Sequence, residues 1–399
     1  MSRTLAAIAS GMLRRGTKHR SLGPGRGAAA GNAAAGCATK ARFEGPNGMS
    51  RPWFLGTIGV VPMHEDVQMN ASAPPRRWRH LRWPALAALV AAHLGTQAQG
   101  VAAPEVFAPG VISATGNVNA VTFSPDGSTA WFDEVAGGGS TIMESHRVDG
   151  AWTPPRIAAF SGEWRDLDPA MAPDGSFIVF CSNRPPSPGG KALDSTTFDG
   201  RLHVGAGSHL WRVDRAGAGW GVPVPLPAAI NDGTRLYSPS VVRDGSLYYQ
   251  RPDAMSHTFH LMRSQFRDGA YQPPEPVVIG PREADERDPA VAPDESFIVF
   301  STKRPPARPD GRLVIAFRSG DHWGEPIDLG DAVNRDGAEG PHLGPDGRTV
   351  YIDSTASFEA AFPRTREQTE RDLQRARLWD NGNSHLWSFS LAPWLDAHR

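Results

Sequence analysis

Three histidines of the 399-residue chain share a sequence context and could bind a metal ion. His209 and His385 stand in the identical tetrapeptide "SHLW", and His260 opens the similar stretch "HLMR". Neutral imidazole is a common ligand of zinc, manganese and iron, and carboxylates complete such sites. The sequence therefore raises the hypothesis of a divalent metal site at His209, His260 and His385. The alternative is that each histidine makes a structural hydrogen bond.

A set of charged residues recurs beside the same segments and could bind a small ligand. Acidic residues stand where an apolar segment begins, and arginines stand just after the next apolar segment ends. The candidate ligand-binding residues are Asp168, Arg184, Arg251, Asp288, Arg304 and Glu339. The alternative is that an acid and an arginine form an ion pair that braces one structural unit. The sequence predicts no catalytic residue.

These residues belong to an internal repeat, and such a repeat decides the fold. The stretch "DPAMAPDGSFIVFCSNRPP" at 168–186 returns as "DPAVAPDESFIVFSTKRPP" at 288–306. Weaker copies share the same turn aspartate. The turn aspartates of the five copies are 48, 70, 50 and 52 residues apart: Asp126, Asp174, Asp244, Asp294 and Asp346. An insertion at about 185–207 explains the one long interval, so the period is close to 50 residues.

Each copy indicates β-strands joined by tight turns. The run "SFIVF" is short and rich in β-branched and aromatic residues, as expected of a strand buried on both faces. The Pro-Asp-Gly before it favours a turn, because Pro fixes φ, Asp bonds to the backbone and Gly accepts a positive φ. Two further strands follow, and four strands per repeat are typical of a propeller blade. The sequence predicts an all-β protein, a single β-propeller of five blades, with six as the alternative.

The two ends of the repeat region predict how the ring closes. The last unit lacks a fourth strand, because the chain stops after "HLWSFSLAPWLDAHR". A spare strand-like stretch, "PEVFAPGVIS", begins at Pro104. We expect this N-terminal strand to complete the C-terminal blade, since that removes an open sheet edge. The propeller is therefore predicted over residues 104–399.

Two insertions lie on the same rim as the candidate residues. The insertion at 185–207 and a second one at 356–382 both join the second and third strands of a unit. This rim is opposite to the Pro-Asp-Gly turns. Ligand sites usually lie on loops that a rigid scaffold holds. We therefore expect the functional site on this rim, and a helix at about 364–379 in the second insertion.

The first hundred residues are set apart from the propeller. Residues 1–68 show no apolar periodicity, and we interpret them as disordered or as upstream sequence before the true start codon. Residues 69–103 have a basic segment, an apolar run from Trp83 to Leu94 and small residues after it, the pattern of a secretory signal peptide. We expect a periplasmic or secreted protein without a permanent membrane anchor, because the apolar run is too short to span a bilayer.

The composition after the signal peptide limits the possible partners. Residues 104–399 carry 28 Lys and Arg and 39 Asp and Glu, a net charge of −11. So acidic a chain is a poor binder of nucleic acid or of anionic membranes. Cys181 is the only cysteine of this region, so no intramolecular disulfide forms and the core must hold the fold. We expect a monomer with no nucleic-acid partner.

The repeat also resembles that of a known family. Units such as "SPDGSTAWF" and "APDGSFIVFCSNRP" resemble the WD40-like repeat of TolB-type β-propellers over nearly all of residues 104–399. The resemblance implies a propeller, and TolB-type propellers usually have six blades. Some TolB-like propellers that cleave pectic oligosaccharides have a histidine-lined metal site in their channel. The resemblance thus implies an alternative, enzymatic function.

The sequence favours binding over catalysis. It lacks a Gly-rich phosphate loop, a His-Glu-x-x-His motif and a nucleophile elbow. We predict an exported propeller that binds a small ligand, a glycan or a protein partner in the cell envelope, without catalysis or a cofactor. The alternative is a metal-dependent carbohydrate lyase or hydrolase with its site at the channel mouth. Converging histidines and carboxylates would favour the enzyme, whereas exposed apolar residues on the insertions would favour a protein partner.

Overall fold

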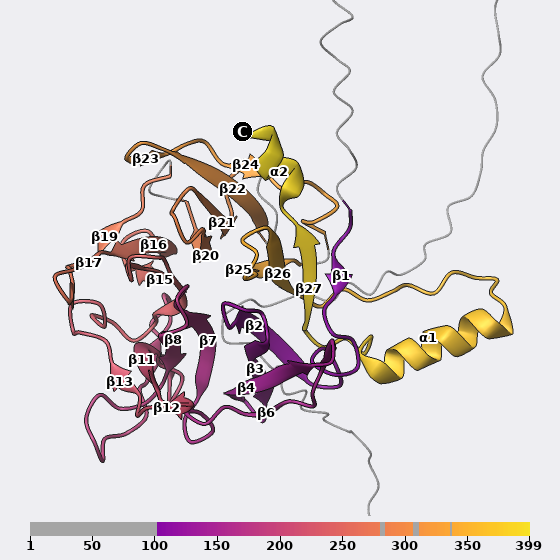
Figure 1. Ribbon diagram of the computed structural model, residues 1–399, viewed down its shortest axis with the longest axis horizontal. Helices are drawn as coiled ribbons and strands as arrows, with labels where there is room; N and C mark the ends of the chain where they lie inside the picture. Colours follow the sequence, from indigo (N-terminus) through magenta and orange to yellow (C-terminus); the bar gives the residue numbers. More distant parts are fainter. Residues whose placement is uncertain (1–101, 280–283, 306–310, 336) are drawn as a thin grey trace, which may run out of the picture. The chain divides into compact units, whose positions relative to one another are not determined.

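The computed structural model describes residues 102–279, 284–305, 311–335 and 337–399. In these ranges the strands form five main antiparallel sheets, each of four or five strands, and Figure 1 shows them arranged in a ring. Residues 1–68 and all but the end of the predicted signal peptide lie outside the described residues. Within the described residues, no helix is long and apolar enough to cross a membrane.

The first three blades follow one another along the chain. Blade 1 consists of β2 (Asn117–Phe123), β3 (Thr129–Ala136), β4 (Gly139–Val148) and β6 (Arg156–Ile157), with the short β5 (Ala151–Trp152). Blade 2 consists of β7 (Asp166–Met171), β8 (Phe177–Ser182), β11 (His209–Ala216) and β13 (Val224–Pro225), with β12 (Gly219–Trp220). Blade 3 consists of β14 (Tyr237–Val241), β15 (Leu247–Asp253), β16 (Thr258–Ser264) and β19 (Glu275–Pro276), with the hairpin of β17 (Phe266–Arg267) and β18 (Ala270–Tyr271).

The last two blades complete the ring. Blade 4 consists of β20 (Glu286–Val291), β21 (Phe297–Thr302), β22 (Arg312–Ser319) and β24 (Ile327–Asp328), with β23 (His322–Trp323). Blade 5 consists of β25 (Glu339–Leu343), β26 (Thr349–Ser354), β27 (His385–Ser390) and β1 (Glu105–Val106). The innermost strands β2, β7, β14, β20 and β25 contact one another in a closed circuit and surround a central channel.

The N-terminal strand closes the ring, as the sequence predicts. Strand β1 pairs antiparallel with β27, so that Glu105 lies opposite Ser388 and Val106 opposite Trp387. The backbone N–H of Phe107 also donates to the carbonyl of Leu386 at 2.8 Å. Blade 5 is therefore built from both ends of the propeller, and the edge of β27 is covered.

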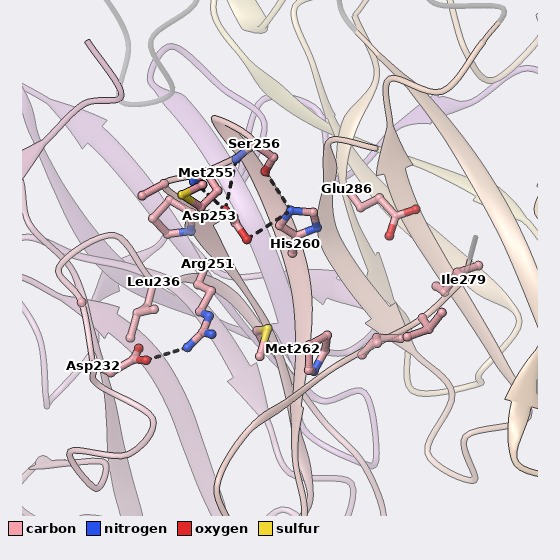
Figure 2. A pocket seen from close by; sticks show the side chains of 16 residues that line it. Asp232, Leu236, Arg251, Asp253, Met255, Ser256, His260, Met262, Ile279 and Glu286 are labelled. Carbon is pink, nitrogen blue, oxygen red and sulfur yellow. Dashed lines mark hydrogen bonds and ion pairs between the residues drawn. The ribbon is translucent and has the colours of Figure 1, made fainter. Parts of the chain in front are cut away.

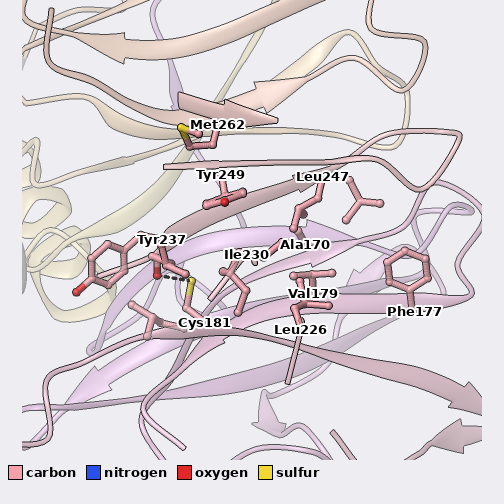
Figure 3. Packing of buried hydrophobic residues seen from close by; sticks show 14 of the residues in the cluster. Ala170, Phe177, Val179, Cys181, Leu226, Ile230, Tyr237, Leu247, Tyr249 and Met262 are labelled. Carbon is pink, nitrogen blue, oxygen red and sulfur yellow. Dashed lines mark hydrogen bonds between the residues drawn. The ribbon is translucent and has the colours of Figure 1, made fainter. Parts of the chain in front are cut away.

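Each blade is buried on both faces because it lies between two others. In β8, Phe177, Val179 and Cys181 pack against blade 3, whereas Ile178 and Phe180 pack against blade 1. Figure 3 shows the cluster between blades 2 and 3. Similar clusters fill the other junctions. The prediction that "SFIVF" strands are buried on both faces is confirmed.

The turn aspartates of the repeat act as turn formers in all five blades, and glycine follows four of them. In each turn an aspartate oxygen accepts the backbone N–H two residues later, at 2.8–3.1 Å. This bond closes the loop between the first and second strands of a blade. We call this side of the propeller the turn rim, and the side where the innermost strands begin the channel mouth.

The two insertions differ in structure. The first carries a small hairpin of β9 (Ser195–Thr196) and β10 (Leu202–His203). The second carries the predicted helix, α1 (Arg366–Leu378), which begins with a capping box between Thr365 and Gln368 and has no buried residue. In Figure 1 α1 lies apart from the sheets. A short helix, α2 (Ala392–Ala397), follows β27.

One of these turns lacks the glycine after its aspartate, and its side chains join two blades. Glu295 replaces the glycine at a φ of 58°, which is unfavourable for a side chain. Its carboxylate accepts the hydroxyl of Tyr248 at 2.6 Å and guanidinium N–H groups of Arg263 and Arg318, both at 2.7 Å. These bonds connect blades 3 and 4, and they offset the backbone strain.

We expect Glu295→Gln to lower the free energy of unfolding by about 1–2 kcal/mol, because a neutral amide weakens three bonds to a partly buried carboxylate. The measurement is the denaturant midpoint of unfolding. Glu275→Gln makes the same chemical change at an exposed residue of β19 and serves as the control. Equal midpoints for the two variants would contradict a bridging role for Glu295.

Candidate functional site

The channel wall is shaped by one unusual residue in each innermost strand. Ala120, Asp168, Ser238, Asp288 and Gly340 all have φ values of 48–58°. Each lies at a shift in the pairing of the first and second strands, which is a β-bulge. A residue in this conformation turns its N–H out of the ladder. The bulge therefore leaves a donor on the channel wall that needs an acceptor.

The acceptor comes from the preceding blade. The N–H of Asp168 donates to Asp133 Oδ1 at 3.2 Å, and the N–H of Ser238 donates to Asp168 Oδ2 at 2.9 Å. The other bonds of this kind run from Ala120 N to Asp353 Oδ1 at 3.0 Å and from Asp288 N to Gln250 Oε1 at 2.9 Å. Successive blades are thus joined around the channel by polar side chains.

Four aspartates form what we call the carboxyl ring: Asp133, Asp168, Asp288 and Asp353. Burial, together with repulsion from Asp168, raises the pKa of Asp133 to about 7. Burial also raises the pKa of the other three; repulsion from ring members adds to the effect for Asp168 and Asp353, and repulsion from Asp285 adds to it for Asp288. Burial and repulsion thus favour the protonated form of Asp133 far more than is usual for an aspartate. The ring carries fewer negative charges than its residue types indicate.

The half of the channel nearer the turn rim is mainly apolar. It holds a cavity of about 180 Å³ lined mainly by apolar residues of all five innermost strands, among them Pro169, Pro239, Pro289 and Pro341. His342 also lines it, and burial lowers the pKa of that imidazole to about 4. Polar chemistry is therefore concentrated at the channel mouth.

Three arginines stand at the channel mouth beside the carboxyl ring. The charge of Arg165 opposes the rise in the pKa of Asp133 and Asp168 that burial causes. Arg165 and Arg235 likewise oppose the rise in the pKa of the buried Tyr237 hydroxyl, so both guanidinium groups lie near that side chain. Arg287 forms a bidentate ion pair with Asp285, at 3.0 and 2.8 Å.

Two of these arginines have no carboxylate partner. Neither Arg165 nor Arg235 makes an ion pair with any residue that the structure describes, and Nη1 of Arg165 is buried without a hydrogen bond. Burial lowers the pKa of Arg235 and repulsion from Arg287 contributes, while Tyr237 and the exposed Asp199 oppose this fall. A partly buried cation without a counter-ion is costly, so this is the part of the mouth most suited to an anionic group.

Aromatic rings form a shelf beside the arginines. Phe198, from the first insertion, stacks on His257 with ring centroids 5.6 Å apart, and Phe259 packs edge-on against Phe198. The guanidinium of Arg235 lies over both phenylalanine rings, and that of Arg287 lies over Phe259. The first insertion thus supplies part of the mouth, as the sequence predicts for this rim.

The structure brings some predicted ligand-binding residues to the channel. Asp168 and Asp288 belong to the carboxyl ring. Glu339 lies on β25 opposite Asp353, and its charge adds to the rise in the pKa of Asp353. These three acids come from three different blades, so it is the bulged innermost strands that collect them around the channel axis.

The predicted arginines are instead engaged in ion pairs. Arg184 donates to Asp166 at 2.9 Å and to the carbonyl of Phe160, and Arg304 makes the equivalent bonds to Glu286 and Ile279. Arg251 pairs with Asp232 at 2.6 Å. These contacts fit the bracing alternative, because each joins the start of an innermost strand, or the loop before it, to the end of the next strand.

A pocket beside blade 3 contains two of the predicted residues. Figure 2 shows Arg251 and His260 lining it, together with Leu236, Met262 and, from blade 4, Glu286; its volume is about 510 Å³. Its charged groups are bonded to one another: Arg251 pairs with Asp232, and Asp253 accepts two backbone N–H groups of its own turn. The pocket therefore offers fewer unpaired polar groups than the channel mouth.

The three histidines do not come together. His209, His260 and His385 lie on the third strands of blades 2, 3 and 5. Third strands lie about 10 Å farther from the channel axis than the innermost strands, so equivalent residues on them diverge. In the described ranges no group of three or more His, Cys, Asp or Glu side chains could hold a metal ion. The expected convergence of these histidines at one metal site is therefore wrong.

The sequence did not predict four of the charged residues at the channel mouth. Asp133 and Asp353 lie on second strands, where alternation predicts only buried packing. Arg165 and Arg235 each stand three residues before a bulge residue, Asp168 and Ser238. An alignment of the repeats on the bulge could have found this shared arginine position.

Comparisons with known proteins do not assign a family. No protein-family model and no curated protein matches the chain. Among similar solved structures is TolB from Agrobacterium tumefaciens, with 14% identity, coverage of 69% of this chain and 90% of that chain, and a TM-score of 0.40. An α-L-arabinofuranosidase from Podospora anserina has 11% identity, coverage of 73% and 96%, and a TM-score of 0.41. TolB structures are thus among the solved structures that the chain resembles. The fold itself is assigned from the strand pairing.

Because of the carboxyl ring, we expect the propeller to become less stable as the pH rises through neutrality. A carboxyl whose pKa is raised in the folded state stabilises that state below its unfolded pKa, and this contribution is lost as the pH rises through about 7. Asp133 faces Asp168, Asp353 and Arg165. We expect Asp133→Asn to raise the free energy of unfolding by on the order of 2 kcal/mol at pH 8 and to change it little at pH 4.

The measurement is denaturant unfolding at pH 4, 6 and 8. Asparagine retains an oxygen for the N–H of Asp168 and an amide for Ser140, so the hydrogen bonds of this site are preserved. Glu325→Gln removes an exposed carboxylate and is the control. A variant as pH-dependent as the parent protein would show that Asp133 does not titrate near neutral pH.

Proposed function

We propose that this propeller is a non-catalytic binding protein of the cell envelope, which binds a small organic anion at the channel mouth. The observation that carries the proposal is the pair of guanidinium groups, Arg165 and Arg235, that make no ion pair among the described residues. Guanidinium binds carboxylate and phosphate groups through paired, charge-assisted hydrogen bonds. A ligand with such a group would supply the counter-ion that the protein does not.

The surroundings of the two arginines favour an organic ligand over a bare inorganic ion. The rings of Phe198 and His257 offer an apolar surface beside Arg235, on which the face of a sugar ring or another flat group can pack. Hydroxyl groups of such a ligand could donate to the carboxyl ring. A glycan that carries a carboxylate combines these three features, in keeping with the sequence-based prediction of a glycan or small ligand.

Binding is favoured over catalysis by what the mouth lacks. A metal-dependent lyase or hydrolase needs several ligands around one ion, and the candidate histidines lie on separate blades. The carboxyl ring could transfer protons, but the described residues at the mouth include no nucleophile held by a base in the manner of a catalytic triad. The periplasmic or secreted location is part of the proposal and rests on the signal-peptide pattern.

A protein partner is a second candidate, favoured by the insertion at 356–382. Phe358 and Phe362 are 53% and 76% exposed, and Leu373 and Leu378 of α1 are also exposed. Large apolar residues so exposed on one projecting segment are typical of interaction surfaces. This segment is anchored by Trp379, which is buried against Trp387. The two functions use different parts of the rim and are compatible.

The ligand class is tested with three sugars that share a ring and differ in charge. We expect glucuronate to bind, and neutral glucose and cationic glucosamine to bind at least about tenfold more weakly, because each charged hydrogen bond contributes about 1.5–3 kcal/mol. Arg235→Ala should weaken glucuronate binding by a similar factor. The measurement is isothermal titration calorimetry on the described propeller region at pH 7.

The control variant is Arg243→Ala, which removes an exposed arginine from the turn rim. It should bind glucuronate as the parent protein does. Tightest binding of glucosamine would mean that the carboxyl ring, and not the arginines, selects the ligand. An equal affinity for glucuronate and glucose would argue against an anion site.

A further inference from the structure

Arg165 belongs to the proposed ligand site and also acts on the carboxyl ring. Its backbone precedes β7 directly, three residues before Asp168, and its charge acts on Tyr237, Asp133 and Asp168. Its charge acts on both carboxyl groups, yet no carboxylate of the described residues lies within ion-pair distance of it. The charge of Arg165 therefore acts both on the carboxyl ring and on any anion that binds at the mouth.

The oxygens of the ring are bonded to the protein and not to Arg165. Asp133 accepts from the N–H of Asp168 and from the hydroxyl of Ser140 at 3.0 Å, and Asp168 accepts from the N–H of Ser238. The hydroxyl of Ser238 donates to Asp288 at 2.7 Å, which links a third carboxyl. An anion can thus bind Arg165 without breaking an ion pair, and the ring would sense it through its electric field.

The charged and titratable groups around the ring come from every blade. They are Asp133 on β3, Arg165 before β7, Asp168 on β7, Cys181 on β8, Tyr237 on β14, Asp285 before β20, Arg287 and Asp288 on β20, Glu339 on β25 and Asp353 on β26. Asp288 has a second cation nearby in Arg287, whereas the field of Arg165 is the one that reaches both Asp133 and Asp168. The pair Asp133 and Asp168 is therefore the part of the ring most sensitive to an anion at Arg165.

We infer that the channel mouth binds an anion and a proton together: an anion on Arg165 is accompanied by uptake of a proton from solvent by Asp133 and Asp168. This inference rests on the proposed function and adds its regulation. The charge of Arg165 opposes protonation of these carboxyls, so an anion that offsets this charge makes them bind more proton. By linkage, protonation of the ring must strengthen anion binding by the same factor. Affinity should therefore rise as the pH falls from 8 to 6.

The experiment uses glucuronate and sulfate, because neither anion titrates between pH 6 and 8. Calorimetric titrations in two buffers of different ionisation heat give the number of protons taken up on binding. We expect a fractional uptake at pH 7 and an affinity at least about threefold higher at pH 6 than at pH 8. Asp133→Asn should abolish most of the uptake and should bind at pH 8 about as tightly as the parent protein binds at pH 6.

The outcomes separate this inference from the proposed function. Binding of either anion without proton uptake and without pH dependence would overturn the coupling and leave the anion site in place. Binding of neither anion at any pH would overturn the anion site, and the coupling with it. Asp168→Asn tests the same carboxyl pair if Asp133→Asn does not fold, and Glu325→Gln, at an exposed position in blade 4, should retain the uptake of the parent protein.

Discussion

The left-handed residue in each innermost strand is the constraint on which the channel depends. A non-glycine residue at φ near 50° costs about 1 kcal/mol or more, and its N–H leaves the sheet ladder. The cost is offset only when the preceding blade supplies an acceptor, as Asp133 does for Asp168 and Asp353 does for Ala120. The same bond thus joins neighbouring blades, lines the channel with polar side chains and buries the carboxyls whose pKa values are raised.

The fold follows from the sequence because its determinants are local and repeated. A buried run such as "SFIVF", a turn aspartate and a fixed period specify one blade, and five copies specify the ring. The closure could also be inferred, since a spare strand at one end matched a missing strand at the other. Five blades form although TolB-type propellers usually have six, and the contact between β2 and β25 closes the ring without a sixth.

The site was only partly predictable, and the propeller geometry explains why. Residues at equivalent positions of different blades lie on a circle around the channel, and the circle widens by about 5 Å with each strand outward. Acids at the starts of innermost strands, such as Asp168 and Asp288, therefore come together. The identical context of His209 and His385 reflected the same repeat position on third strands, which keeps them apart. Asp133 was hard to find from the repeat, because only one of its four equivalents, Asp353, is also an aspartate; the others are Cys181, Gln250 and Ser301.

Those equivalents also argue that the ring does more than support the fold. Gln250 accepts the N–H of Asp288 at 2.9 Å and so performs, without a charge, the structural task of Asp133 and Asp353. A buried carboxylate in the same place costs folding free energy that an amide would not. The titratable carboxyl groups of Asp133 and Asp353 are therefore more than the blade junction requires. Buried titratable groups beside an arginine that makes no ion pair among the described residues are typical of a site that binds a ligand.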